Sequence, residues 1–251
     1  MILHHRITGP PDAPVLLMGG SLGTNLKMWD LQLPLAERFR LVRFDHRGHG
    51  GSPVPPGPYE IAEFGGDVLA LMDELGMGRA SYCGLSIGGM VGMWLAIHAP
   101  ERIDRLVLVC TSAYMPPASA WQERARAVLA AGSTEPIADA VVGRWLTPGF
   151  ADTCPEVRAD LRAMLVAAPP EGYAWSCGAI ERMDQREQLT QIAVPTLVIS
   201  GSDDPATPLA MQEEIVAAVP GARHEVVGPA AHIAVVEQPD AVNQLIEEHL
   251  G

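Results

Sequence analysis

Ser86 lies in a pattern that can make a serine hydroxyl nucleophilic. The segment Gly84-Leu-Ser-Ile-Gly88 fits G-x-S-x-G, in which the serine occupies a sharp, strained turn between a strand and a helix. The two glycines leave room where a Cβ would clash with a passing chain. The apolar run 80–83 predicts a short buried strand, and apolar residues at helical spacing then predict a helix that ends at Pro100. Strand, turn and helix together indicate that Ser86 is a nucleophile.

A nucleophilic serine needs a base to take its proton and an acid to orient that base. Around an elbow of this kind the chain order is serine, then aspartate or glutamate, then histidine. Of the eight histidines, His232 is the one in a loop after a late predicted strand. Asp203 and Asp204 compete for the acid, and Asp204 is favoured because the acid of this fold normally lies there, three residues after Gly201. The predicted triad is therefore Ser86, Asp204 and His232.

A glycine-rich loop at 19–24 follows the predicted strand 15–18. It contains neither G-x-x-x-x-G-K nor G-x-G-x-x-G, so it lacks the phosphate-binding patterns. The loop instead fits the first oxyanion loop of a hydrolase, which presents a backbone N–H to the developing alkoxide. On that alignment Leu22 supplies one N–H and Ile87 the other. A plain turn is the alternative interpretation.

Two histidines in the segment 45–52, His46 and His49, are three residues apart and raise the question of a metal site. The region offers no third ligand at a suitable spacing, and glycine-rich turns often carry polar residues. We therefore expect no metal here, and expect the segment to brace the loops around the serine.

The order of predicted elements indicates a single α/β domain with a mostly parallel sheet flanked by helices and a helical cap inserted in it. We expect a core of 1–112 and 189–251 and a cap of 113–188, a region where strand patterns disappear. Three of the five tryptophans fall in the cap, which can cover the serine and shape a pocket, although at least one of them packs in the cap's own core. The predicted strands are 3–8, 15–18, 41–44, 80–83, 105–110, 195–200 and 225–227. The predicted helices are 61–75, 120–131, 137–146, 156–167, 173–183, 209–219 and 239–250.

The composition limits the class of partner. A formal net charge of −13 argues against nucleic acid, which selects basic surfaces, and an anionic substrate would need a local cationic group. The sequence contains no run of about 18 apolar residues, so it predicts no membrane span, and the N-terminus lacks the apolar run of a signal peptide.

The four cysteines are far apart and form no C-x-x-C pair, so we expect buried free thiols in a reducing cytoplasm. These cysteines are Cys83, Cys110, Cys154 and Cys177.

Stretches spread over nearly the whole chain carry a more specific resemblance. In the core they are Ser21-Leu-Gly-Thr-Asn-Leu-Lys-Met-Trp-Asp30, Phe44-Asp-His-Arg-Gly-His-Gly50, Cys83-Gly-Leu-Ser-Ile-Gly-Gly89, Val198-Ile-Ser-Gly201 through Thr207-Pro208, and Ala230-Ala-His232. In the cap they are Arg144-Trp-Leu-Thr-Pro148, Gly172-Tyr-Ala174 and Arg186-Glu-Gln-Leu189. With these stretches the chain resembles the 3-oxoadipate enol-lactonases, a family with the α/β-hydrolase fold. Gly20 stands where the family usually has Asn. Some relatives carry a fused C-terminal decarboxylase domain, so a sequence that ends at Gly251 is either a standalone protein or part of such a fusion.

The resemblance implies hydrolysis of an enol-lactone, such as 3-oxoadipate enol-lactone, to a keto acid in aromatic catabolism, without a metal or cofactor. A substrate of this kind is a small anionic lactone with a free carboxylate. Arg144, which adjoins Trp145, and Arg124 are our candidates for binding it, because the planar guanidinium binds a carboxylate bidentately. The alternative for each arginine is a surface pair with a nearby carboxylate.

Two other functions remain open from the sequence. One is a different hydrolase with the same triad, such as an esterase, a C–C bond hydrolase or a perhydrolase. The other is a non-catalytic binding protein on the same scaffold, which an intact triad disfavours. The sequence does not predict the oligomeric state.

Overall fold

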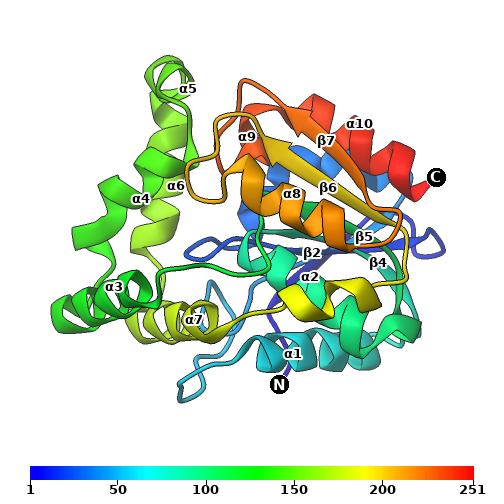
Figure 1. The fold of residues 1–251 in the computed structure, drawn as a ribbon, viewed down its shortest axis with the longest axis horizontal. Helices are drawn as coiled ribbons and strands as arrows, with labels where there is room; N and C mark the ends of the chain where they lie inside the picture. Colours follow the sequence, from blue (N-terminus) through cyan, green and yellow to red (C-terminus); the bar gives the residue numbers. More distant parts are fainter.

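The computed structural model describes all residues 1–251, and its centre is a seven-stranded sheet. The strand order is β1-β3-β2-β4-β5-β6-β7; β1 is antiparallel to β3 and every other pair is parallel (Figure 1). The strands are β1 His5–Thr8, β2 Val15–Gly19, β3 Arg40–Phe44, β4 Ala80–Leu85, β5 Ile103–Val109, β6 Thr196–Gly201 and β7 Arg223–Val227. The predicted fold class, a mostly parallel α/β sheet, is confirmed.

All seven strands predicted from the sequence are present, with ends that differ by a few residues. The central strands are apolar on both sides because helices cover both faces of the sheet, as parallel sheets require. At the edge, β7 begins at Arg223, two residues before the predicted start. The reason is pairing: Arg223 and His224 lie opposite Leu197 and Val198 of β6, so backbone hydrogen bonds extend the strand beyond its apolar part.

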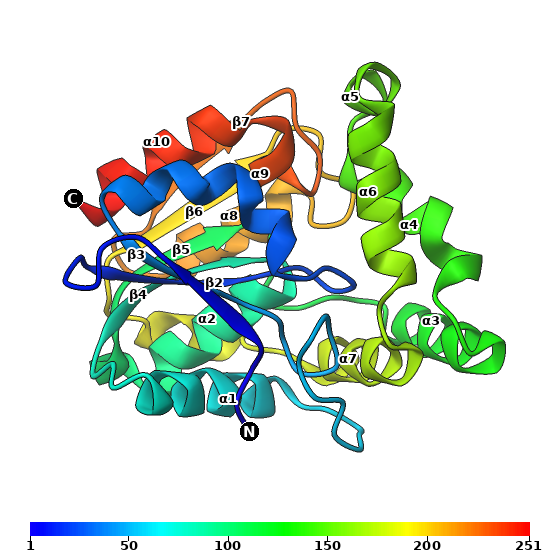
Figure 2. The same ribbon diagram turned by 180° about the vertical axis from the view of Figure 1, so that it is seen from behind.

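Helices cover the two faces of this sheet. On one face are α1 (Ile61–Glu74), α2 (Ile87–His98) and α8 (Leu209–Ala218); on the other are α10 (Pro239–Leu250) and a 3₁₀ helix, Leu26–Glu37 (Figures 1 and 2). No helix in the structure is both long enough and apolar enough to cross a membrane.

The five helices of the cap region lie between β5 and β6 in the chain and stand at one side of the sheet (Figure 1). They are α3 Ala118–Ala131, α4 Ala138–Trp145, α5 Pro148–Thr153, α6 Pro155–Val166 and α7 Pro170–Arg182. Where the segment leaves and rejoins the core, the N–H of Gln185 donates to the carbonyl of Ala113 at 2.9 Å, and Tyr114 and Asp184 form a β-bridge. The limits 113–188 remain our proposal for the cap.

Four cysteines are free, as expected, although Cys154 is only half-buried whereas Cys83, Cys110 and Cys177 are buried. Of the three cap tryptophans, Trp175 is a packing residue. Its ring meets that of Tyr59 edge-on, with centroids 5.4 Å apart, and it covers Gly57. Trp121 and Trp145 lie at the cavity described below.

Candidate active site

Ser86 has the strained backbone of a nucleophile elbow. It lies between the end of β4 and the start of α2 with φ 58° and ψ −117°, a left-handed φ that few residues other than glycine adopt. A Cβ at Gly84 would lie 2.2 Å from the carbonyl oxygen of Gly88, so no larger residue fits there. The Ser86 carbonyl accepts a hydrogen bond from the Thr111 hydroxyl at 2.6 Å, which helps to hold the turn.

His232 and Asp204 are in direct contact. The distance from His232 Nδ1 to Asp204 Oδ2 is 2.9 Å, and both residues are buried. The Asp204 carboxylate also accepts hydrogen bonds from the N–H groups of Ala206 and Thr207, at 2.8 and 3.0 Å, and from the Thr207 hydroxyl at 2.6 Å. Burial raises the pKa of Asp204, but the charge and hydrogen bond of His232 and the Thr207 hydrogen bonds outweigh it, so the pKa lies below its ordinary value. Asp204 is thus an ionised partner for the imidazole.

Asp203, the alternative acid, is placed differently. Its side chain is exposed and accepts a hydrogen bond from the neighbouring Ser202 hydroxyl at 2.5 Å. It makes no contact with His232. The geometry therefore favours Asp204 over Asp203 as the orienting acid.

The two predicted oxyanion donors lie on either side of Ser86. Leu22, in the turn after β2, lines the same cavity as Ser86, and its N–H donates to no group of the protein. Ile87 is the first residue of α2, a position whose N–H has no partner within the helix. The N–H of Gly88 donates to the carbonyl of Gly20 at 3.1 Å, which ties the loop of Leu22 to the start of α2. Both N–H groups can therefore serve an oxygen at Ser86.

A cavity of about 180 Å³ brings together residues from the core and the cap. Its wall includes Ser86 and His232 from the core and Arg124, Arg144 and Trp145 from the cap. The other residues of its wall are Ser21, Leu22, Met90, Met115, Pro116, Ala120, Trp121, Val141, Tyr173, Ile180, Pro205, Ala206 and Thr207. The predicted nucleophile, base and substrate-binding residues thus share one cavity.

Neither cavity arginine is paired with a carboxylate. Arg124 lies over the ring of Trp121, with its Cζ 4.6 Å from the ring centroid, and its guanidinium also acts on the Tyr173 hydroxyl. Neither Arg124 nor Arg144 forms an ion pair with a carboxylate. Burial first, and then the positive charge of Arg124, lower the pKa of Arg144. The cavity wall contains no aspartate or glutamate. Two like charges without a counter-ion favour an anion over a neutral group in this cavity.

Tyr173 is a cavity residue that sequence reasoning missed. Its side chain is fully buried and its hydroxyl has no hydrogen-bond partner. The ring packs against Gly23, where a Cβ would lie 3.1 Å from Tyr173 Cε2, and the charges of Arg124 and Arg144 act on the phenol. Burial raises the pKa of the Tyr173 phenol, so at neutral pH the hydroxyl is a free hydrogen-bond donor. The signal in the sequence was the cap stretch 172–174, which the resemblance contains.

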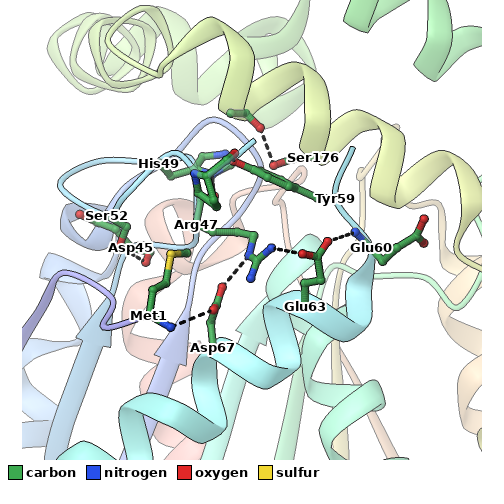
Figure 3. A network of polar contacts seen from close by, with 12 residues as sticks. Met1, Asp45, Arg47, His49, Ser52, Tyr59, Glu60, Glu63, Asp67 and Ser176 are labelled. Carbon is green, nitrogen blue, oxygen red and sulfur yellow. Dashed lines mark hydrogen bonds and ion pairs between the residues drawn. The ribbon is translucent and has the colours of Figure 1, made fainter. Parts of the chain in front are cut away.

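The segment 45–52 supports the loops around Ser86 through buried polar contacts. Asp45 accepts hydrogen bonds from the N–H groups of Leu26 and Gly51, at 2.6 and 2.8 Å. Arg47 lies between two carboxylates of α1, with Nε 2.6 Å from Asp67 Oδ2 and one terminal nitrogen 2.6 Å from Glu63 Oε1 (Figure 3). The bracing role expected for this segment agrees with these contacts.

The same segment, 45–52, also packs against the cap. The backbone of Gly48 approaches α7 so closely that a Cβ at Gly172 would lie 2.2 Å from the Gly48 carbonyl oxygen.

The ring of His46 is buried between Phe44 and Phe64, with ring centroids 5.2 and 5.6 Å away, and burial lowers the pKa of His46 to about 3. His46 is therefore packed as a neutral aromatic side chain.

Comparisons with known proteins show to which family the chain is similar. The α/β hydrolase fold family matches residues 13–239. The chain is 42% identical to 3-oxoadipate enol-lactonase 2 of Acinetobacter baylyi over 98% of this chain and 91% of that protein. The crystal structure of the enol-lactonase from Burkholderia xenovorans LB400 is similar with a TM-score of 0.96 and 41% identity, over 99% of this chain and 96% of that one.

A more distant solved structure is a thermophilic esterase from Thermogutta terrifontis with malate bound. Its TM-score is 0.92 and its identity 31%, over 99% of this chain and 92% of that one. The likeness extends through the cap as well as the core, because each match covers nearly the full length of both chains. The chain therefore belongs to the 3-oxoadipate enol-lactonase family of α/β hydrolases, and it is a hydrolase of ester or lactone bonds.

Proposed function

We propose that this protein hydrolyses 3-oxoadipate enol-lactone to 3-oxoadipate, a reaction of aromatic catabolism by the β-ketoadipate pathway, with Ser86, His232 and Asp204 as its triad. The observation that carries the proposal is the cavity whose wall holds Ser86 and His232 from the core and two arginines without a carboxylate partner from the cap. A hydrolase of neutral esters has no use for two arginines without counter-ions. A hydrolase that acts on an enol-lactone with a free carboxylate can use both arginines to bind that carboxylate.

In the first half of the reaction, Ser86 Oγ attacks the lactone carbonyl carbon while His232 Nε2 takes the hydroxyl proton. Asp204 holds the other ring nitrogen as a donor and so fixes the tautomer that leaves Nε2 free. The carbonyl oxygen becomes an oxyanion, which the N–H groups of Leu22 and Ile87 stabilise by about 3–4 kcal/mol each in comparable sites. Collapse of this intermediate breaks the ring C–O bond and leaves an acyl group on Ser86.

The leaving group in this step is an enolate, which departs readily and becomes a ketone when it takes up a proton at carbon. It stays attached to the acyl group because the substrate was a ring, so the cavity must hold the opened chain. The proton that His232 took from Ser86 passes to the enolate, and His232 is neutral again. Water then gives a proton to His232 and attacks the ester carbon, and collapse of the second intermediate returns this proton to Ser86 Oγ and releases the product acid. None of these steps calls on a metal or a cofactor.

The substrate carboxylate binds at the cap end of the cavity. Arg124 and Arg144 offer charge and planar donors, and the Tyr173 hydroxyl offers a third, neutral donor that has no other partner. The related Thermogutta esterase, which has malate bound, supports a carboxylate ligand in this scaffold. The substrate-binding residues proposed here are thus Arg124, Arg144, Trp145 and Tyr173.

A second candidate is a general carboxylesterase, which the 31% identity to an esterase over nearly the full chain favours. The test is turnover of a panel that contains 3-oxoadipate enol-lactone, a lactone of equal ring size without the carboxylate, and p-nitrophenyl acetate. We expect kcat/KM for the carboxylate lactone to exceed that for the neutral lactone by a factor of at least about 10, the effect of one charged hydrogen bond. Equal values, or turnover of p-nitrophenyl acetate alone, would favour the esterase.

A further inference from the structure

A buried carboxylate outside the triad joins the cap to the loop that carries His232. Glu237 ends the short helix α9 (Ala234–Glu237), and only 7% of its surface is exposed. Its Oε1 accepts hydrogen bonds from the N–H and the hydroxyl of Thr147, at 2.9 and 2.6 Å. Its Oε2 accepts one from the N–H of Ala231, at 2.5 Å. α9 lies at the side of the core that faces the cap (Figures 1 and 2).

Both residues that flank His232 in the chain donate hydrogen bonds that fix their positions. Ala231, the residue before it, donates to Glu237, and Ile233, the residue after it, donates its N–H to the carbonyl of Trp145 at 2.9 Å. The partners on the cap side are Trp145 and Thr147, which are two residues apart in the chain. One short cap segment, 145–147, thus fixes the loop at both sides of the histidine.

The same cap segment forms part of the cavity wall. Trp145 and the preceding Arg144 line the cavity together with His232. A substrate that contacts Arg144 or Trp145 therefore meets a wall that is tied by backbone and side-chain hydrogen bonds to the proposed base.

A carboxylate suits this junction because three donors converge on it. No lysine or arginine forms an ion pair with Glu237, so the three donors alone compensate its charge. A glutamine would have one acceptor oxygen and would turn an amide N–H₂ toward donors. Hydrogen bonding of the Thr147 pair or of Ala231 would then be lost.

We propose that Glu237 is a positioning residue that sets the place of His232 relative to the cap wall of the cavity. This proposal rests on the proposed role of His232 as the base. Loss of the link leaves substrate binding at the arginines intact but misplaces the imidazole, and a misplacement of about 1 Å costs on the order of 100-fold in rate.

The central variant is Glu237→Gln. We expect kcat to fall by roughly 10- to 100-fold while KM changes by less than about threefold. The rate at which a fluorophosphonate labels Ser86 depends on the same base but not on lactone recognition, and it should fall by a similar factor. The control is Gln238→Ala, which removes a hydrogen bond from the adjacent residue to the same loop, at the Pro229 carbonyl, and should change neither rate.

Thr147 provides a second, milder test that does not depend on how Glu237→Gln folds. Thr147→Val removes the hydroxyl donor and should lower kcat. Thr147→Ser keeps the hydroxyl and should have a kcat close to that of the wild-type protein. The double variant Thr147→Val with Glu237→Gln should have the same kcat as Glu237→Gln alone, because both changes break the same contact between Thr147 and Glu237.

Several outcomes would overturn the proposal. One is a Glu237→Gln protein with a lower melting temperature but wild-type kcat and labelling rate, since the carboxylate would then serve stability alone. Another is a loss confined to KM, and a third is a double variant whose losses multiply. A wild-type protein that labels at Ser86 but hydrolyses no carboxylate lactone would instead refute the proposed substrate and leave the labelling test of Glu237 valid.

Discussion

Replacing Arg124 by methionine separates substrate recognition from folding. Arg124→Met keeps an unbranched side chain of similar length on α3 and removes the charge from the cavity wall. In the native protein this guanidinium has no carboxylate partner, so the change breaks no ion pair. No carboxylate of the protein therefore depends on the Arg124 charge.

The expected magnitudes follow from these contacts. A hydrogen bond to a charged group contributes about 1.5–3 kcal/mol, so KM for the carboxylate lactone should rise by roughly 10- to 150-fold. Folding loses the contact of Arg124 with the Trp121 ring, about 0.5–1 kcal/mol, and gains from the relief of repulsion with Arg144. The two effects oppose each other, so the free energy of unfolding should change by less than about 1 kcal/mol.

The assay compares steady-state kinetics on the carboxylate lactone and on p-nitrophenyl acetate, with urea unfolding in parallel. Arg126→Met is the matched control, because Arg126 is exposed on the same helix and only bonds to the Gln122 carbonyl at 3.3 Å. It should leave both substrates and the unfolding free energy unchanged.

Three results would refute the reasoning on Arg124. Equal losses on the charged and the neutral substrate would mean that Arg124 maintains the shape of the cap. A marked drop in the free energy of unfolding would mean that the guanidinium has a structural partner. An unchanged KM would remove Arg124 from the substrate site.

Further predictions concern the triad. Ser86→Ala should lower kcat by about 10⁴-fold or more with the fold intact by circular dichroism, and a variant with more than about a tenth of wild-type turnover would exclude Ser86 as the nucleophile. Asp204→Asn should lower kcat by about 10⁴-fold and Asp203→Asn hardly at all, since the Asp203 carboxylate bonds only to the Ser202 hydroxyl; reversed effects would move the acid to Asp203. Because the folded-state pKa of Asp204 is lowered, its contribution to stability is fully present above the ordinary aspartate value of about 4 and is lost only as the pH falls through the lower value. Acid unfolding of Asp204→Asn should therefore lack that component.

Local patterns were enough to predict the sheet and the placement of the proposed triad. The elbow around Ser86 is a pattern of consecutive residues. Asp204 and His232 each follow a strand that a run of apolar residues predicts. Since strand ends of a parallel sheet meet at one edge, chain order alone brings these side chains together.

What the sequence did not show depends on contacts between distant segments. Glu237 is 90 residues from Thr147, and no local pattern marks a buried carboxylate that is satisfied by donors across such a separation. The free hydroxyl of Tyr173 is likewise defined by an absence of partners that only the packed cavity reveals. The helix Leu26–Glu37 was missed because it is 3₁₀ and contains Pro34, so its apolar residues do not follow the 3.6-residue period.

Ala113, the first residue of the cap segment, and Gln185, close to its last residue, are joined by a backbone hydrogen bond at 2.9 Å. The insertion therefore leaves and rejoins the core at one place between the parallel strands β5 and β6. Its length has only a small effect on the entropy of closing this connection, because that cost grows slowly with the size of a loop. We expect that exchange of the cap segment as a cassette would change the wall of the cavity while Ser86, Asp204 and His232 remain on the core. A compatible cassette has two requirements: a glycine where Gly172 meets Gly48, and donors that satisfy Glu237.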